Sequence, residues 1–106
     1  MSAGEVPTPL YTVTYTQRVL DGLVRLGRQA RERGDGEQFV TALKEFHRRL
    51  CLYPQFGDPL NDLRRAVGYV RIGILPPLSM RYAVLEERRS VFVGAVPVLL
   101  PRFEAA

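Results

Sequence analysis

The sequence predicts an α+β domain in which a helical hairpin packs on one face of a small, mainly antiparallel sheet. Three observations predict this β-α-α-β-β-β order. Residues Tyr11 to Thr16 alternate with a period of two, as strands do. The stretch from Gln17 to Leu52 has apolar residues at helical spacing and one break, at Gly34-Asp35-Gly36. Three strand-like runs close the chain: Ala66–Leu75, Leu78–Glu86 and Ser90–Leu100.

Local signals define the first strand and the two helices. Tyrosine and valine alternate with threonine in the strand, and Thr16 is placed to cap the first helix. Gly34 ends that helix, and Asp35 is expected to cap the second one. Phe39 and Phe46 belong to a core stripe on the second helix. The short connection makes the two helices antiparallel.

Proline and glycine punctuate the C-terminal half. Tyr53 to Asn61 is expected to be a loop, because it contains two prolines and a glycine. Pro76-Pro77 connects the runs Ala66–Leu75 and Leu78–Glu86. The charged turn from Glu86 to Arg89 is short, so the two runs that flank it are expected to form a hairpin. Pro97 and Pro101 predict that the last strand frays, kinks or lies at a sheet edge.

Alternation also assigns side chains to the two faces of the sheet. Tyr82 lies between Met80 and Val84 in a run expected to face the core. Arg71 and Arg81 are then expected on the opposite, polar side of neighbouring strands, where they meet across the ladder. The simpler alternative is that these arginines form a solvated face, or pair with the glutamates of the charged turn.

Composition fits one soluble domain. Among 106 residues, 1–9 are expected to be a flexible leader and 10–106 a single domain. The net charge is +4, and Lys44 is the only lysine beside many arginines, which bind phosphate and carboxylate well. The single cysteine, Cys51, excludes an internal disulfide, and no metal or cofactor motif is present. Without a membrane span or signal peptide, we expect a cytoplasmic protein.

The C-terminal half contains a series of strand motifs: Leu63, Tyr69-Val70-Arg71-Ile72-Gly73, Met80-Arg81-Tyr82-Ala83-Val84 and Val91-Phe92-Val93. With these motifs the chain resembles the RelE/ParE superfamily of bacterial toxins from type II toxin–antitoxin systems. The resemblance extends over roughly Leu10 to Leu100. It implies a β-α-α-β-β-β fold, a cognate antitoxin, and action either on mRNA in the ribosome or on DNA gyrase.

For a ribosome-dependent mRNA endonuclease, the expected catalytic residues are Arg71, Arg81 and Tyr69. Cleavage by the 2′-hydroxyl requires a base, an acid and cations that stabilise the phosphorane. The arginines supply the positive charge, and Tyr69 stacks on a base or assists proton transfer. The lone His47 is expected to be a surface or half-buried side chain rather than a catalyst.

Arg64, Arg65 and Arg102 are the expected nucleic-acid-binding residues. Departures from the family pattern favour other activities. Ser79 stands where the resemblance implies an arginine, and Arg102 alone remains of the basic stretch implied after the last strand. The alternatives are a non-nucleolytic, ParE-like toxin that binds a protein such as gyrase, and a non-toxic member that serves as an interaction protein.

The last strand also predicts protein partners. Val91-Phe92-Val93 would make an apolar sheet edge, and such edges are usually covered. An antitoxin segment is the occupant that the resemblance implies. A homodimer through the same strand is the other expectation.

Overall fold

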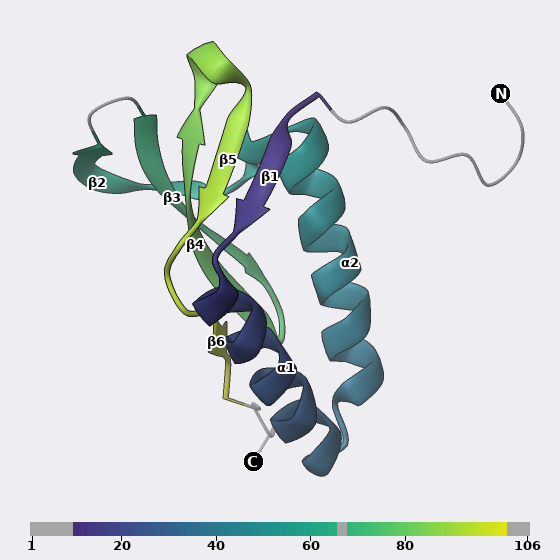
Figure 1. Cartoon of the computed structure of the whole chain (residues 1–106). Coiled ribbons are helices and arrows are strands. Elements are labelled where there is room, and N and C mark those ends of the chain that lie inside the picture. The colour runs from purple at the N-terminus through teal and green to yellow at the C-terminus, as the bar shows by residue number, and fades with distance from the viewer. Residues whose placement is uncertain (1–9, 66–67, 102–106) are drawn as a thin grey trace, which may run out of the picture.

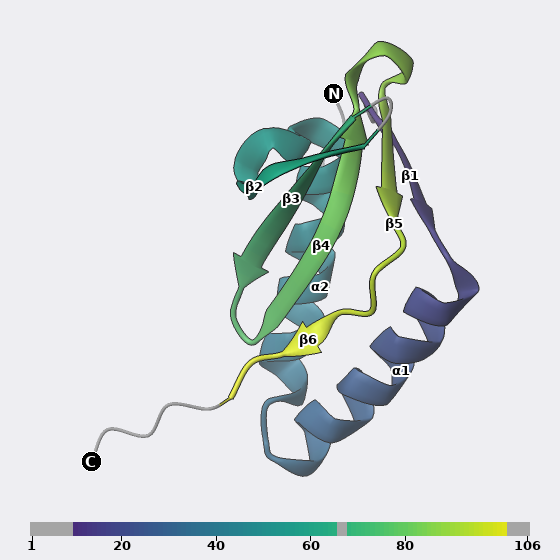
Figure 2. The ribbon, with the colours of Figure 1, turned by 90° about the vertical axis from the view of Figure 1, so that its left-hand side faces the viewer.

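The computed structural model describes residues 10–65 and 68–101, and of residues 61–65 and 68–69 the backbone alone. Two helices lie together on one side of a sheet, as Figure 1 shows. Figure 2 views the sheet from the side on which no helix covers it. The elements are β1 (Thr12–Tyr15), α1 (Gln17–Glu32), α2 (Gly36–Leu52), η1 (Pro54–Phe56), β2 (Asp58–Arg65), β3 (Gly68–Leu75), β4 (Leu78–Leu85), η2 (Glu86–Arg88), β5 (Ser90–Val93) and β6 (Val98–Leu99).

The fold is α+β, with a mixed sheet of six strands where four were expected. The strand order is β1-β5-β4-β3-β2, and β6 pairs with the other end of β4. All pairings are antiparallel except that of β1 with β5. The expected loop from Tyr53 to Asn61 is wrong in its second part, because β2 begins at Asp58. The expected leader and Arg102 lie outside the described residues.

The last strand is interrupted as its prolines predict, but β5 is not a sheet edge. Residues 94–97 separate β5 from β6, so the predicted kink is confirmed. β5 is paired on both sides, with β1 in parallel and with β4 in antiparallel orientation. The chain's own first strand thus pairs with the segment Val91-Phe92-Val93. The prediction that this segment is a sheet edge, to be covered by a partner, is therefore wrong.

The helical hairpin begins and ends close to the predicted residues. The Thr16 hydroxyl accepts a hydrogen bond from the Val19 N–H at 3.2 Å, which confirms the predicted cap of α1. Asp35 does occupy the N-cap position of α2, but its side chain forms no capping bond. Its carboxylate instead accepts from Arg33 Nε at 2.7 Å. Arg33 also donates to the Leu100 carbonyl at 2.8 Å, so this corner joins the two helices to the end of the chain.

The core lies between the helices and the sheet. Phe46 from α2 and Met80, Tyr82 and Val91 from the central strands are almost completely buried there. Gly73 on β3 faces the same core: a Cβ atom on it would lie 2.7 Å from the Phe46 ring. The absence of a side chain at Gly73 therefore lets α2 approach the sheet closely.

The register of β3 and β4 places Arg71 and Arg81 on opposite faces, so the prediction that they share one face is wrong. Arg71 pairs with Tyr82, and Ile72 pairs with Arg81. Directly paired residues in an antiparallel ladder share a face. Tyr82 belongs to the core, so Arg71 lies on the helix-covered face and Arg81 on the open face. Only two residues connect β3 with β4. Because the connection is this short, odd-numbered residues of β3 pair with even-numbered residues of β4.

Candidate functional site

The open face of the sheet carries a hollow of about 650 Å³, lined by residues from five strands. This volume lies within the range of about 300–1,000 Å³ that is usual for ligand pockets. Its walls are mainly apolar: Leu60, Val70, Leu85 and Phe92 line it, and Phe92 remains 46% exposed. Since the helices occupy the other face, this hollow lies on the side that Figure 2 turns toward the viewer.

The position of the Phe92 ring depends on a neighbouring glycine. A Cβ atom on Gly94 would lie 2.6 Å from Phe92 Cε1, so the ring occupies space that any other residue at position 94 would fill. Both residues line the hollow. Gly94 therefore leaves room for the Phe92 ring, which adds exposed aromatic surface to the lining of the hollow.

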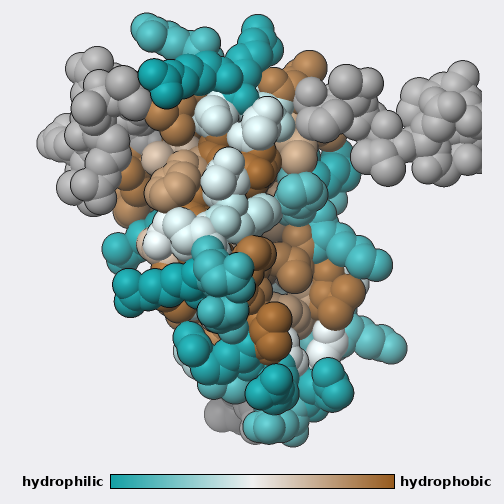
Figure 3. Space-filling model, viewed as in Figure 1, coloured by the Kyte–Doolittle hydropathy of each residue, from teal (hydrophilic) through white to brown (hydrophobic). Residues whose placement is uncertain are grey.

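Among the described residues that line the hollow, the charged ones are Arg81 and Arg88. Arg81 extends from β4 and Arg88 from η2, and Thr14 and Ser90 add hydroxyl groups. Neither guanidinium forms an ion pair with any residue that the structure describes. Hydrophilic side chains project at the η2 end of the molecule, at the top in Figure 3. The hollow thus combines apolar walls with two cations that have no partner within the described chain.

Arg71 performs a different task on the other face. Its Nη1 donates to the Gly57 carbonyl at 2.7 Å and to the Gln55 carbonyl at 3.3 Å. Both carbonyls belong to the segment that connects α2 with β2. The Tyr82 hydroxyl, 2% exposed, ties down the same segment, because it donates to the Pro54 carbonyl at 2.6 Å and accepts from the Gly57 N–H at 3.0 Å. Arg71 is therefore a structural clamp in this conformation.

The other predicted site residues are not brought to the hollow by any described contact. Tyr69 pairs with Val84 and Arg64 pairs with Tyr69 in the ladder, while Arg65 pairs with Gly68. Their side chains lie outside the described part of the chain, as does the whole of Arg102. Of the predicted catalytic residues whose side chains the structure describes, Arg81 lines the hollow and Arg71 does not.

A polar network that sequence reasoning missed surrounds Glu86. Its carboxylate accepts from the Tyr11 hydroxyl at 2.8 Å and from Gln55 Nε2 at 2.6 Å. These two hydrogen bonds, with smaller contributions from Arg71 and Arg89, lower the pKa of Glu86. The network joins the start of β1, η1 and η2, which are far apart in sequence. Both carboxylate oxygens already have donors, so we interpret it as a structural junction.

A second missed contact joins β1 to α2. The Tyr15 hydroxyl lies 2.8 Å from His47 Nδ1, and Cys51 Sγ lies 3.5 Å from His47 Nε2. His47 is exposed, as predicted, and Cys51 is half-buried. Burial raises the pKa of the Cys51 thiol, and its place in the last turn of α2 also disfavours a thiolate. This geometry does not favour nucleophilic chemistry.

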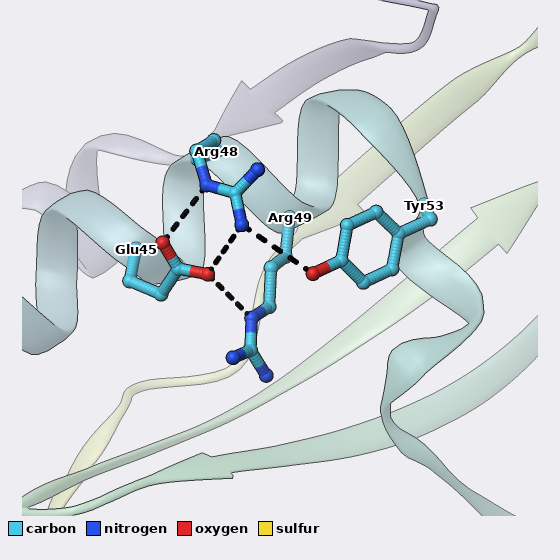
Figure 4. Close-up of polar contacts among 4 residues, drawn as sticks. All are labelled: Glu45, Arg48, Arg49 and Tyr53. Carbon is cyan, nitrogen blue, oxygen red and sulfur yellow. Dashed lines mark hydrogen bonds and ion pairs between the residues drawn. The ribbon is translucent and has the colours of Figure 1, made fainter.

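The last turns of α2 carry an exposed ionic cluster, drawn in Figure 4. Glu45 accepts hydrogen bonds from Arg48 at 2.7 and 2.8 Å and from Arg49 at 2.7 Å. These bonds lower the pKa of Glu45 to about 2. Arg48 also lies over the Tyr53 ring, with 5.9 Å between its Cζ and the ring centroid. Exposed pairs of this kind contribute little to stability.

Among the described residues, no group of three or more His, Cys, Asp or Glu side chains is arranged to hold a metal ion. Within the same residues, neither helix has the length and apolar character needed to cross a membrane. No protein-family model matches the chain, and no curated protein matches it.

Proposed function

We propose that this chain is the toxin component of a type II toxin–antitoxin system, with a RelE/ParE-like fold. Its site of action is the cytoplasm, and its partners are a cognate antitoxin and a protein target such as DNA gyrase. The fold is consistent with this proposal. One strand, a helical hairpin and a mainly antiparallel sheet follow one another along the chain, as the resemblance implies.

The separation of Arg71 from Arg81 favours protein binding over mRNA cleavage. The two guanidiniums lie on opposite faces of the sheet, so they cannot stabilise one phosphorane together. Arg71 is also engaged by backbone carbonyls. The hollow around Arg81 offers apolar surface and exposed aromatic area, which are typical of protein interfaces. A non-nucleolytic toxin is therefore the activity that this geometry supports best.

Induced expression in a bacterial host tests the proposal. Growth, mRNA integrity and plasmid supercoiling are followed together. We expect growth arrest with intact mRNA and with loss of negative supercoiling or DNA breaks. mRNA fragments that appear with the onset of arrest would establish the endonuclease instead. Unchanged growth would indicate a non-toxic interaction protein.

A matched pair of variants links the arrest to the hollow. Phe92→Ser removes exposed aromatic surface from the lining of the hollow, whereas Val24→Ser removes apolar surface from the outside of α1, where Val24 is 62% exposed. We expect Phe92→Ser to relieve growth arrest and Val24→Ser to preserve it. If both variants relieve growth arrest to the same extent at equal protein levels, the hollow is not the surface that causes toxicity.

A further inference from the structure

We propose that His47 and Cys51 form a chelating site for a tetrahedral, borderline-soft cation of the zinc class. Both residues lie near the end of α2, on the helix-covered side of the sheet, whereas the hollow lies on the open side. The inference therefore does not depend on the proposed function. It follows from three features of the pair: the spacing along the helix, the separation of the two ligand atoms and the partner of the second imidazole nitrogen.

The spacing puts both side chains on one face of α2. His47 and Cys51 are four residues apart, which is about one helical turn. Cys51 Sγ lies 3.5 Å from His47 Nε2. Zinc binds thiolate sulfur at about 2.3 Å and imidazole nitrogen at about 2.0–2.1 Å. With these bond lengths, a separation of 3.5 Å between the ligand atoms gives an S–Zn–N angle of about 107°, which is close to tetrahedral.

Tyr15 positions the imidazole in the form that a cation needs. The Tyr15 hydroxyl lies 2.8 Å from His47 Nδ1, and the two rings stack with 5.8 Å between their centroids. A metal-bound imidazole usually donates its other N–H to an oxygen acceptor, which sets the tautomer and the orientation of the ring. With Nδ1–H donating to the Tyr15 oxygen, Nε2 keeps its lone pair for a cation shared with Cys51. Tyr15 is therefore a positioning residue, and it comes from β1, which lies beside the end of α2 in Figure 1.

The ligand atoms select the class of cation. One sulfur and one imidazole nitrogen suit zinc, whereas calcium and magnesium prefer oxygen ligands. Binding replaces the thiol proton of Cys51 by the cation and releases this proton to solvent, so the bound cation balances the charge of the thiolate. His47 is exposed and Cys51 is half-buried. Among the described residues, no third His, Cys, Asp or Glu side chain is arranged with this pair, so water completes the coordination.

Titration of the purified, reduced full-length protein with Co²⁺ and Zn²⁺ tests the chelate. His47 and Cys51 are the only histidine and the only cysteine of the chain, so each signal has a single origin. Co²⁺ bound to a thiolate gives a charge-transfer band in the near ultraviolet. We expect this band at one Co²⁺ per chain, and its loss when Zn²⁺ is added. In nitrogen-15 NMR spectra, Zn²⁺ should shift Nε2 of His47 and leave Nδ1 protonated. Zn²⁺, but not Mg²⁺, should also protect Cys51 from alkylation.

Three variants distinguish a chelate from a cysteine that binds alone, and circular dichroism confirms that each is folded. Tyr15→Phe removes the acceptor of Nδ1–H. It should weaken Zn²⁺ binding by about tenfold, keep the cobalt–thiolate band and increase the share of the tautomer protonated at Nε2. His47→Gln keeps the thiol but removes a ligand, so it should weaken binding more than Tyr15→Phe does. Lys44→Gln removes an exposed positive charge one turn before His47 without changing a ligand, and it should not weaken binding.

Several results would overturn the proposal. A cobalt–thiolate band of equal strength and affinity in His47→Gln would assign the cation to Cys51 alone. A wild-type protein without this band, or with an unshifted His47 spectrum at saturating Zn²⁺, would leave a hydrogen-bonded contact only. Equal protection of Cys51 by Mg²⁺ would exclude a thiolate–imidazole site. One Zn²⁺ per two chains, in a dimer that Cys51→Ser dissociates, would replace the water ligands by those of a second copy.

Discussion

Replacing Arg71 with alanine should destabilise the protein rather than remove a reacting group. The guanidinium donates to the Gly57 carbonyl at 2.7 Å and, more weakly, to the Gln55 carbonyl at 3.3 Å. A hydrogen bond that involves a charged group contributes about 1.5–3 kcal/mol when buried. Arg71 is half-buried and its second bond is long. We therefore expect Arg71→Ala to lower the free energy of unfolding by about 2 kcal/mol.

Thermal and urea denaturation measure this loss. At roughly 4 °C per kcal/mol for a domain of this size, the melting temperature should fall by about 8 °C. Arg81→Ala is the matched control, because Arg81 is exposed and its loss should change stability by less than about 0.5 kcal/mol. Arg71→Lys keeps the charge without the planar fork and should lie between the two.

The reasoning fails if Arg71→Ala is as stable as Arg81→Ala. It also fails if Arg71→Ala keeps full stability but loses the growth arrest that the wild-type protein causes. The second result would assign Arg71 a direct functional role. A destabilised Arg71→Ala protein that still arrests growth at low temperature would support the structural role specifically.

Four further predictions concern the core and the surface. Tyr82→Phe removes a buried hydroxyl that serves two backbone groups and should destabilise by about 1–3 kcal/mol in urea. Burial raises the pKa of Tyr82 to about 12 in the folded protein. Above about pH 10 the unfolded chain loses this proton while the folded protein keeps it, so the free energy of unfolding should fall between about pH 10 and 12. The fall should be less steep in Tyr82→Phe. Glu45→Gln should change stability by less than about 0.5 kcal/mol at neutral pH, and it should remove the part of the acid destabilisation that develops as pH falls from 4.5 toward 2. Gly73→Ala inserts a methyl group 2.7 Å from the buried Phe46 ring and should lower stability by about 1–3 kcal/mol, seen as a lower urea midpoint.

Local patterns predicted the helices well because their determinants are local. The Thr16 cap, the Gly34 stop and the apolar stripe through Phe46 identify a hairpin whose ends differ from the structure by few residues. The kink after Val93 followed equally from Pro97. In each case one residue's backbone preference or side chain determines the outcome, so neighbouring sequence suffices.

Pairing between distant segments was harder to predict. β2 contains Pro59, which marks a loop in sequence, but its pairing with β3 includes a register shift between Pro59 and Arg64. Such irregular edge strands tolerate proline. The cover that β1 provides for β5 is also a long-range feature, because these strands are separated by the whole helical hairpin. No local pattern in Val91-Phe92-Val93 distinguishes an edge from an interior strand.

The faces of Arg71 and Arg81 could have been separated from sequence alone by combining two constraints. Only Pro76 and Pro77 connect β3 with β4, and Leu75 pairs with Leu78, so residues of equal parity on the two strands must face opposite sides. Alternation predicts which residues of one strand share a face, but it does not say which face of β3 meets the helices. Gly73 decides that, because the helix-side position needs space for the Phe46 ring. The aliphatic residues of β3 are thereby turned to the open face beside Arg81. The register that separates Arg71 from Arg81 therefore also places the aliphatic side chains of β3 around the open-face hollow.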